Sequence, residues 1–163
     1  MKTEENLKTA FQGESQAYMK YSSFAARAEQ EGHHQVARLF RAVAEAEKVH
    51  ALNHLAVMED SGETSTNITA AIDGETYEFT QMYPAFIEQA EQEGSNRAAS
   101  SFKSASAVEK IHNNLYDRAL KNLGRNREED YYVCSVCGNT VAEGIPDRCE
   151  VCGAAADKFR YVE

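Results

Sequence analysis

The strongest constraint on this chain is an internal repeat that carries a paired acid and histidine motif. A shift of 62 residues aligns Glu47-Lys-Val-His50 with Glu109-Lys-Ile-His112, and 12 of the 30 positions from 21 to 50 are identical at 83 to 112. Side chains three residues apart lie on the same face of an α-helix, so each motif places a carboxylate beside an imidazole. Two copies of one helix hairpin predict a four-helix bundle, because the period is too long and the copies too few for a solenoid.

Apolar residues recur at steps of three and four along four segments, which predicts four amphipathic helices. The first is expected from Thr3 to Gly32, the second from His33 to Asp60, the third from near Gly74, and the fourth from Ser95 to Leu123. A polar connection is expected from Ser61 to Asp73. Pro84 should distort the third helix, because proline lacks a backbone donor.

The same periodicity places acidic side chains on the buried helix faces. Glu14 lies within the apolar stripe of the first helix, and the two Glu-x-x-His motifs lie within those of the second and fourth. The repeat aligns Glu14 with Thr76, so Glu75, Glu78 or both take its place in the third helix. Buried carboxylates repel one another and are costly without a metal. One Glu from each of two helices and Glu-x-x-His from each of the others is the ligand pattern of ferritin-like di-iron bundles.

All four cysteines lie in the last 30 residues, as Cys134-Ser-Val-Cys137 and Cys149-Glu-Val-Cys152. Four thiolates with this spacing form a tetrahedral site for iron or zinc, and the spacing does not choose between the metals. We therefore expect a bundle over residues 1–124, a charged linker over 125–130 and a small metal-bound domain over 131–163. A domain of this size is too small to fold on a hydrophobic core alone, so we expect the bound metal to stabilise its fold. Tyr131 or Tyr132 and Phe159 would form its small core.

Composition excludes several other classes of protein. The net charge of −9 argues against a nucleic-acid partner, because phosphate contacts need a basic surface. No apolar run approaches the roughly 20 residues that span a membrane, and the first residues lack the apolar core of a signal peptide. On these two grounds a cytoplasmic location is expected. In such a reducing compartment, clustered Cys-x-x-Cys pairs are more often metal ligands than disulfides.

The chain resembles the rubrerythrins over essentially its whole length. The resemblance rests on Gly13-Glu14-Ser-Gln-Ala17, both Glu-x-x-His motifs, Gly74-Glu75-x-x-Glu78 leading into Met82-Tyr-Pro84, and the terminal cysteine pairs. It implies a ferritin-like domain followed by a rubredoxin-like domain. It further implies a non-haem di-iron peroxidase that reduces hydrogen peroxide to water in oxidative-stress defence, with three irons per chain. The external electron donor would be rubredoxin or an NAD(P)H-dependent reductase, and the protein would form a homodimer or a larger assembly.

The resemblance also implies roles for individual residues. Glu47 and Glu109 would bridge the two irons, and the terminal ligands would be Glu14, Glu75 and His112. In the family, one iron moves between a Glu and a His as the redox state changes, and the matching positions are Glu78 and His50. Cys134, Cys137, Cys149 and Cys152 would hold the third iron. Tyr21 and Tyr83 match tyrosines that hydrogen-bond ligand carboxylates, although a plain aromatic core would account for them equally well.

The rubredoxin-like segment departs from the usual pattern at two positions. Asn139 follows the first cysteine pair where an aromatic residue is usual, and Glu150 follows Cys149 where proline is usual. Neither residue is a ligand, so the departures bear on the redox potential and the docking surface.

Two alternative functions remain open from the sequence. One is a ferritin-like iron oxidation and storage protein, and the other is a dioxygen-using di-iron oxidase with a zinc-ribbon tail. The cysteine tail and the additional acid among Glu75 and Glu78 argue against storage. The sequence leaves open zinc in place of iron in either site, the identity of the electron donor, and whether hairpins of one chain or of two build the bundle.

Overall fold

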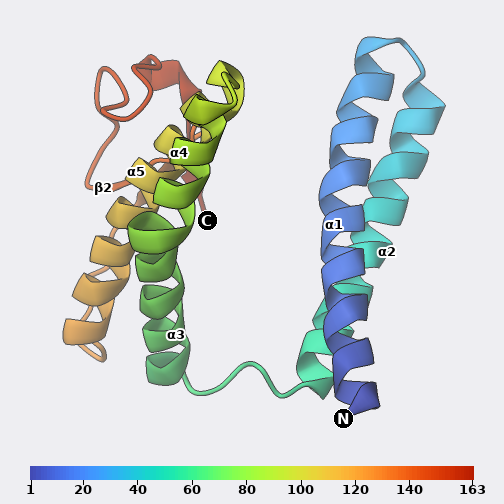
Figure 1. The fold of residues 1–163 in the computed structure, drawn as a ribbon, viewed down its shortest axis with the longest axis horizontal. Helices are drawn as coiled ribbons and strands as arrows, with labels where there is room; N and C mark the ends of the chain where they lie inside the picture. The colour runs from blue at the N-terminus through green and yellow to red at the C-terminus, as the bar shows by residue number, and fades with distance from the viewer. The chain divides into compact units, whose positions relative to one another are not determined.

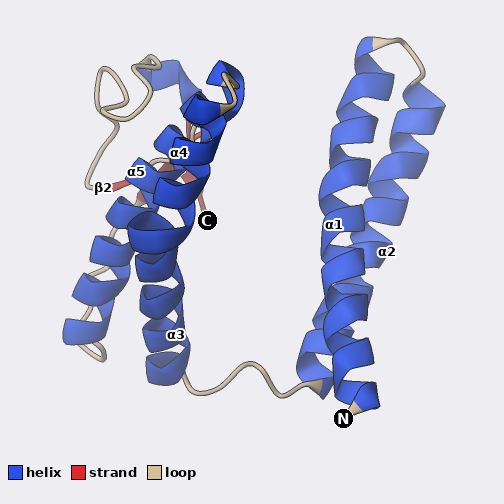
Figure 2. Cartoon of the chain, viewed as in Figure 1, coloured by secondary structure: helices blue, strands red, loops and turns tan.

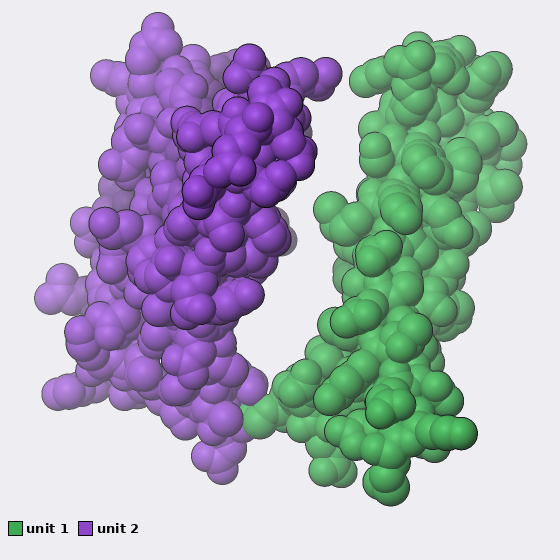
Figure 3. All heavy atoms as spheres, in the orientation of Figure 1, with its two compact units in different colours: residues 1–62 green, residues 63–163 purple.

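The computed structural model describes residues 1–163, which divide into two compact units, 1–62 and 63–163 (Figure 3). The first unit is a hairpin of α1, Lys2–Gln30, and α2, His34–Val57. The second unit contains helices α3, Thr64–Tyr77, η1, Glu78–Met82, α4, Tyr83–Gln92, and α5, Asn96–Lys121. A small sheet of β1, Tyr131–Cys134, β2, Thr140–Ala142, and β3, Phe159–Val162, completes it, with a short 3₁₀ turn at Ala156–Lys158 (Figures 1 and 2). None of the helices is apolar over a long enough stretch to cross a membrane.

In both hairpins of the repeat, the same backbone motif forms the turn between the two helices. Gly32 follows α1 with a φ of +80°, and Gly94 follows α4 with a φ of +70°. After each glycine the next backbone N–H reaches back to an alanine carbonyl, from His33 to Ala28 and from Ser95 to Ala90, each at 2.8 Å. These are Schellman caps, which need a left-handed residue that glycine adopts without steric cost. The predicted end of the first helix at Gly32 is therefore confirmed.

Small side chains and aromatic rings form the interior of each hairpin. Alanines line the helix contacts, which lets the helices approach closely: Ala25, Ala28, Ala37, Ala44 and Ala51 are buried in the first unit, and Ala90 and Ala99 in the second. Three aromatic rings pack together in each repeat, with centroids 5.6 to 6.3 Å apart, within the range of favourable ring contacts. The trios are Tyr21, Phe24 and Phe40, and their repeat partners Tyr83, Phe86 and Phe102. The repeat read from the sequence therefore corresponds to a structural repeat.

The segment 61–73 was expected to be a polar connection, and this expectation is wrong for most of it. Helix α3 begins at Thr64, so only a short stretch after α2 is non-helical. The amide of Asn113 on α5 donates to the carbonyl of Ile72 at 3.0 Å and to the hydroxyl of Thr76 at 2.7 Å. These contacts hold α3 against α5, and tertiary contacts of this kind override the weak helix propensity of a Ser/Thr-rich segment.

The predicted distortion near Pro84 is confirmed, and it explains the slip in the repeat. Residues Glu78–Met82 form one turn of π-helix directly before α4, which carries Pro84 in its first turn. A π-helical turn accommodates one extra residue. Accordingly, Glu14 precedes Tyr21 by seven residues, whereas Glu75 precedes the equivalent Tyr83 by eight. The inserted residue therefore makes Glu75, and not Thr76, the structural counterpart of Glu14.

The C-terminal residues 131–163, here called the four-cysteine module, form a three-stranded antiparallel sheet in the order β2-β1-β3. Cys134 pairs with Phe159 across β1 and β3. Phe159, Cys134 and Cys149 are buried, and Tyr132 packs against them, whereas Tyr131 is 38% exposed. Of the two tyrosines considered for this core, Tyr132 is therefore the one that contributes.

Candidate metal centres

The first unit brings together one acid from α1 and the Glu-x-x-His motif of α2. Donor atoms of Glu14, Glu47 and His50 all lie within 4.8 Å of one another. The Nδ1 atom of His50 lies 2.9 Å from a carboxylate oxygen of Glu47. The side chain of Glu47 is 17% exposed and that of His50 is 54% exposed. We call this set the α1–α2 cluster.

The second unit contains the repeat counterpart, the α3–α5 cluster of Glu75, Glu109 and His112. Nδ1 of His112 lies 2.9 Å from Glu109 Oε2 and 3.7 Å from Glu75 Oε1. Its three side chains are between 16% and 25% exposed. The two clusters thus have the same donor types and the same short contact between histidine and glutamate.

Electrostatics in the α3–α5 cluster favour a bound cation. Burial, and then the hydrogen bond and the repulsion from Glu109, raise the pKa of Glu75 to about 7. The pKa of Glu78 is also raised, first by burial and then by Glu109, with His112 opposing the shift. Burial and the same carboxylates raise the pKa of Tyr83. Carboxylates crowded in this way repel one another, and a metal cation relieves that repulsion.

Glu78 and Tyr83 interact electrostatically with the α3–α5 cluster, although Glu78 is not among its three converging side chains. Glu78 opens the π-helical turn, and its charge interacts with Glu109 and His112. Tyr21 and Tyr83 belong to the aromatic trios described above. Ligation by Glu78 and hydrogen bonding by the tyrosines to ligand carboxylates remain predictions.

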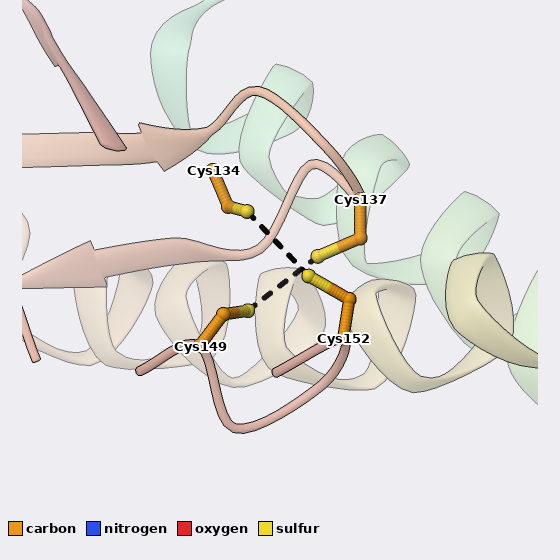
Figure 4. Close-up of side chains that lie close together, drawn as sticks. All are labelled: Cys134, Cys137, Cys149 and Cys152. Carbon is orange, nitrogen blue, oxygen red and sulfur yellow. Dashed lines mark hydrogen bonds between the residues drawn. The ribbon is translucent and has the colours of Figure 1, made fainter. Parts of the chain in front are cut away.

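The four cysteines bring their sulfurs to one point (Figure 4). The Sγ atoms of Cys134 and Cys152 are 3.7 Å apart, and those of Cys137 and Cys149 are 3.6 Å apart. A disulfide requires about 2.05 Å, so all four are free thiols. A tetrahedron with metal–sulfur bonds of about 2.3 Å has edges of about 3.8 Å, which these separations match closely. The donor set therefore fits an iron or zinc ion.

Hydrogen-bond donors surround the sulfurs. Burial opposes ionisation of the Cys149 thiol, but the backbone N–H groups of Cys152 and Val151 and the side chain of Asn139 outweigh it and lower its pKa to about 6. Burial raises the pKa of the Cys137 thiol, and the backbone N–H of Asn139 counteracts the shift in part. Gly138 and Gly153, which directly follow the two cysteine pairs, both have positive φ. The loops thus point backbone donors at the metal site.

Sequence reasoning missed Thr140, which links the module to the α3–α5 cluster. Its Oγ1 lies 3.1 Å from Nε2 of His112 and donates to the carbonyl of Gly138 at 3.2 Å. When the hydroxyl proton goes to the Gly138 carbonyl, Oγ1 accepts from Nε2–H of His112. In that tautomer Nδ1 of the neutral imidazole is unprotonated, so Nδ1 and Glu109 Oε2 both present lone pairs to the same place. A metal cation satisfies that arrangement.

The module also packs on α5 near this bond. Val108, which is 2% exposed, lies 3.9 Å from the position that a Cβ would take on Gly138. A pocket of about 490 Å³ opens beside the contact, lined by His112, Leu115, Tyr116, Ala119, Tyr131 and Thr140. The linker 125–130 therefore does not hold the module away from the helices of its own unit.

Comparison with known proteins agrees with this arrangement. The Rubrerythrin family model matches residues 5–120, and a model described as "Rubrerythrin, rubredoxin-like domain" matches residues 132–160. The chain belongs to the rubrerythrin family. The fold class expected from the sequence is confirmed: it is mainly α, with the helices of a ferritin-like bundle followed by a small rubredoxin-like domain.

Individual members of the rubrerythrin family match the chain almost end to end. Rubrerythrin-2 from Clostridium acetobutylicum is 33% identical over 175 residues, covering 97% of this chain and 95% of that protein. Rubrerythrin from Porphyromonas gingivalis is 35% identical over 170 residues, covering 93% and 85%. A solved structure of nigerythrin in its fully reduced, all-ferrous state is 31% identical, with a TM-score of 0.61 over 98% of this chain and 86% of that one.

For this rubrerythrin-family chain, Thr140→Val is expected to weaken metal binding by the α3–α5 cluster about tenfold or more, as loss of a hydrogen-bond partner to a ligating histidine typically does. Valine keeps the branched shape that suits strand β2 but removes the acceptor for His112 Nε2–H. Competitive titration with Co²⁺ measures the affinity. Thr140→Ser retains the hydroxyl and should bind like the unmodified protein; equal affinities for the valine and serine variants would contradict the role.

Proposed function

We propose that this chain is a non-haem di-iron peroxidase that reduces hydrogen peroxide to water, with electrons delivered through an iron ion held by its four cysteines. The observation that carries the proposal is the hydrogen bond between His112 and Thr140. It joins a carboxylate–histidine cluster directly to a module whose four sulfurs fit a metal ion. A covalently attached redox site in contact with a metal ligand is of use to an enzyme that must be re-reduced after every turnover.

In this proposal the α1–α2 and α3–α5 clusters serve one pair of irons. Glu47 and Glu109 would bridge them, and Glu14, Glu75 and His112 would be terminal ligands. Glu78 and His50 would compete for one iron, because a ferric ion favours the carboxylate and a ferrous ion the imidazole. When bound, a reduced iron pair would supply both of the electrons that, with two protons from solvent, convert hydrogen peroxide into two waters.

The remaining residues hold the ligands in place. Thr140 keeps Nε2 of His112 protonated and its Nδ1 available for a metal. The hydroxyl of Tyr83 is protonated at neutral pH and is therefore a hydrogen-bond donor, and burial and nearby carboxylates raise its pKa further above the ordinary value. The proposed role of Tyr83, and of Tyr21 by the repeat, is to donate to ligand carboxylates and fix their orientation.

The four-cysteine module is proposed as the relay. A single iron held by the four cysteines would carry one electron at a time, so two successive transfers would be needed to reduce the pair. The solved nigerythrin structures include mixed-valence, partially reduced and fully reduced states, and a relay of this kind passes through such states. The external donor is a rubredoxin or an NAD(P)H-dependent reductase.

Metal analysis of protein produced with ample iron tests this assignment. About three iron ions per chain are expected, with a red colour from thiolate-to-iron absorption. Deletion of residues 131–163 should remove the colour and about one iron. Many irons per chain would instead indicate storage, and a colourless protein with zinc on the cysteines would contradict the relay.

A further inference from the structure

One side chain in the four-cysteine module has a placement that the turn itself does not require. Asn139 is completely buried, with 0% of its surface exposed. Its Nδ2 donates to Cys149 Sγ at 3.5 Å, while its Oδ1 has no hydrogen-bond partner. Buried polar atoms without partners are uncommon, and each one calls for a physical explanation.

The second cysteine loop provides an internal comparison. In the first loop, the N–H of Gly138 donates to Cys134 O at 2.8 Å, and the N–H of Cys134 donates to Asn139 O at 2.9 Å. The second loop repeats both bonds through Gly153, Cys149 and Ala154, each at 2.8 Å. Ala154 therefore occupies the position equivalent to Asn139. Since alanine completes the same turn, the amide of Asn139 is not there to form the loop.

The orientation of the amide follows from the sulfur. A metal-bound thiolate can only accept hydrogen bonds, so the NH₂ group must face Cys149 and the carbonyl oxygen must face away. The backbone N–H of Asn139 separately donates to Cys137. One residue thus provides donors to two of the four sulfurs, and only its side-chain donor depends on the residue being asparagine.

We propose that the side-chain amide of Asn139 raises the reduction potential of an iron held by the four cysteines, by donating a hydrogen bond to the Cys149 thiolate. The proposal rests on the proposed function insofar as the module holds iron. Four thiolates give a ferric site one net negative charge and a ferrous site two, so reduction adds negative charge to the sulfurs. A donor aimed at a sulfur stabilises the reduced state more than the oxidised state.

The test is the midpoint potential of the four-cysteine iron, measured by spectroelectrochemistry on the full-length, iron-loaded protein. Asn139→Leu keeps the branched side-chain skeleton in a bulkier form without a donor, and Asn139→Ala is smaller and cannot overpack the site. Each variant is expected to lower the equilibrium constant for reduction about tenfold, which corresponds to about 59 mV for a one-electron couple. Val141→Ala changes packing against the same cysteine core without touching a sulfur hydrogen bond, and should shift the potential much less.

The outcomes separate clearly. A fall in potential for both Asn139 variants, with little change for Val141→Ala, supports the proposal. The leucine and alanine variants change the volume of the site differently, and the loss of the donor is the only change that they share. An unchanged or higher potential in either iron-containing variant overturns it. The measurement does not depend on peroxide turnover. A lack of peroxidase activity would contradict the proposed function. The difference in reduction potential between the variants could still be measured on iron-reconstituted protein.

Discussion

Replacement of Cys134 by alanine is expected to stop sustained peroxide reduction while sparing the first turnover. Cys134 is 1% exposed and is one of the four sulfurs that converge in the module. In the proposed mechanism, a protein without Cys134 loses the four-cysteine iron, and a protein reductase then has no route to re-reduce the other irons. The steady-state rate of peroxide reduction should fall to the uncatalysed background rate. A chemically pre-reduced sample should still complete a single turnover of peroxide in a stopped-flow experiment.

The contact between the module and α5 makes a second control necessary. Loss of the module's metal could disturb Thr140 and therefore His112, which would slow the first turnover for a structural reason. Zinc in the four-cysteine site preserves the tetrahedral thiolate geometry but carries no redox chemistry. Zinc-loaded protein with iron in the bundle should behave like the Cys134 variant in steady state and like the unmodified protein in the first turnover. Undiminished steady-state activity of the zinc form would show that electrons bypass the module.

Glu109→Ala is expected to reduce the metal content from about three ions per chain to about one, with the red colour retained. Glu109 is the centre of the α3–α5 cluster, because it contacts His112 at 2.9 Å and hydrogen-bonds to Glu75. In the proposed ligand set it bridges both irons, so its loss should release the pair together. Elemental analysis and the visible spectrum measure both effects.

Two further substitutions serve as a control and a comparison for Glu109→Ala. Asp117 lies on the same helix in an exposed pair with Lys121, so Asp117→Ala should leave the metal content unchanged. Glu47 is the repeat counterpart of Glu109, and Glu47→Ala should also release both bundle irons. If each glutamate variant instead lost a single, separate metal, the two clusters would be independent mononuclear sites and the di-iron assignment would be wrong.

The helix faces and the ligand types were predictable because both follow from periodicity. Steps of three and four placed Glu47, His50, Glu109 and His112 on one face of their helices, and the repeat predicted their equivalence. The choice between Glu75 and Glu78 was not predictable. It depends on a π-helical turn at Glu78–Met82, and a single inserted residue leaves no distinct sequence pattern. The register shift and a distortion near Pro84 were both predicted from the sequence, but the form of that distortion, a π-helical turn, was not.

Residues that act through tertiary contacts were beyond the reach of local patterns. Thr140 meets His112 across 28 positions of sequence, and no periodicity or spacing connects them. Helix α3 likewise packs against α5, where Asn113 donates to Ile72 and Thr76, although its own Ser/Thr-rich sequence favours a loop. Asn139 was noticeable as a departure from the rubredoxin pattern, but its role as a donor became apparent only from its distance to Cys149.

Anaerobic titration of the fully reduced, iron-loaded protein with hydrogen peroxide tests the central claim most directly. Because each peroxide takes two electrons, about one and a half equivalents per chain should oxidise all of the iron, with water as the only product. Mössbauer spectra should show the bundle irons and the four-cysteine iron converted to the ferric state at that end point. Release of dioxygen, or bundle iron that stays ferrous while peroxide persists, would contradict a di-iron peroxidase.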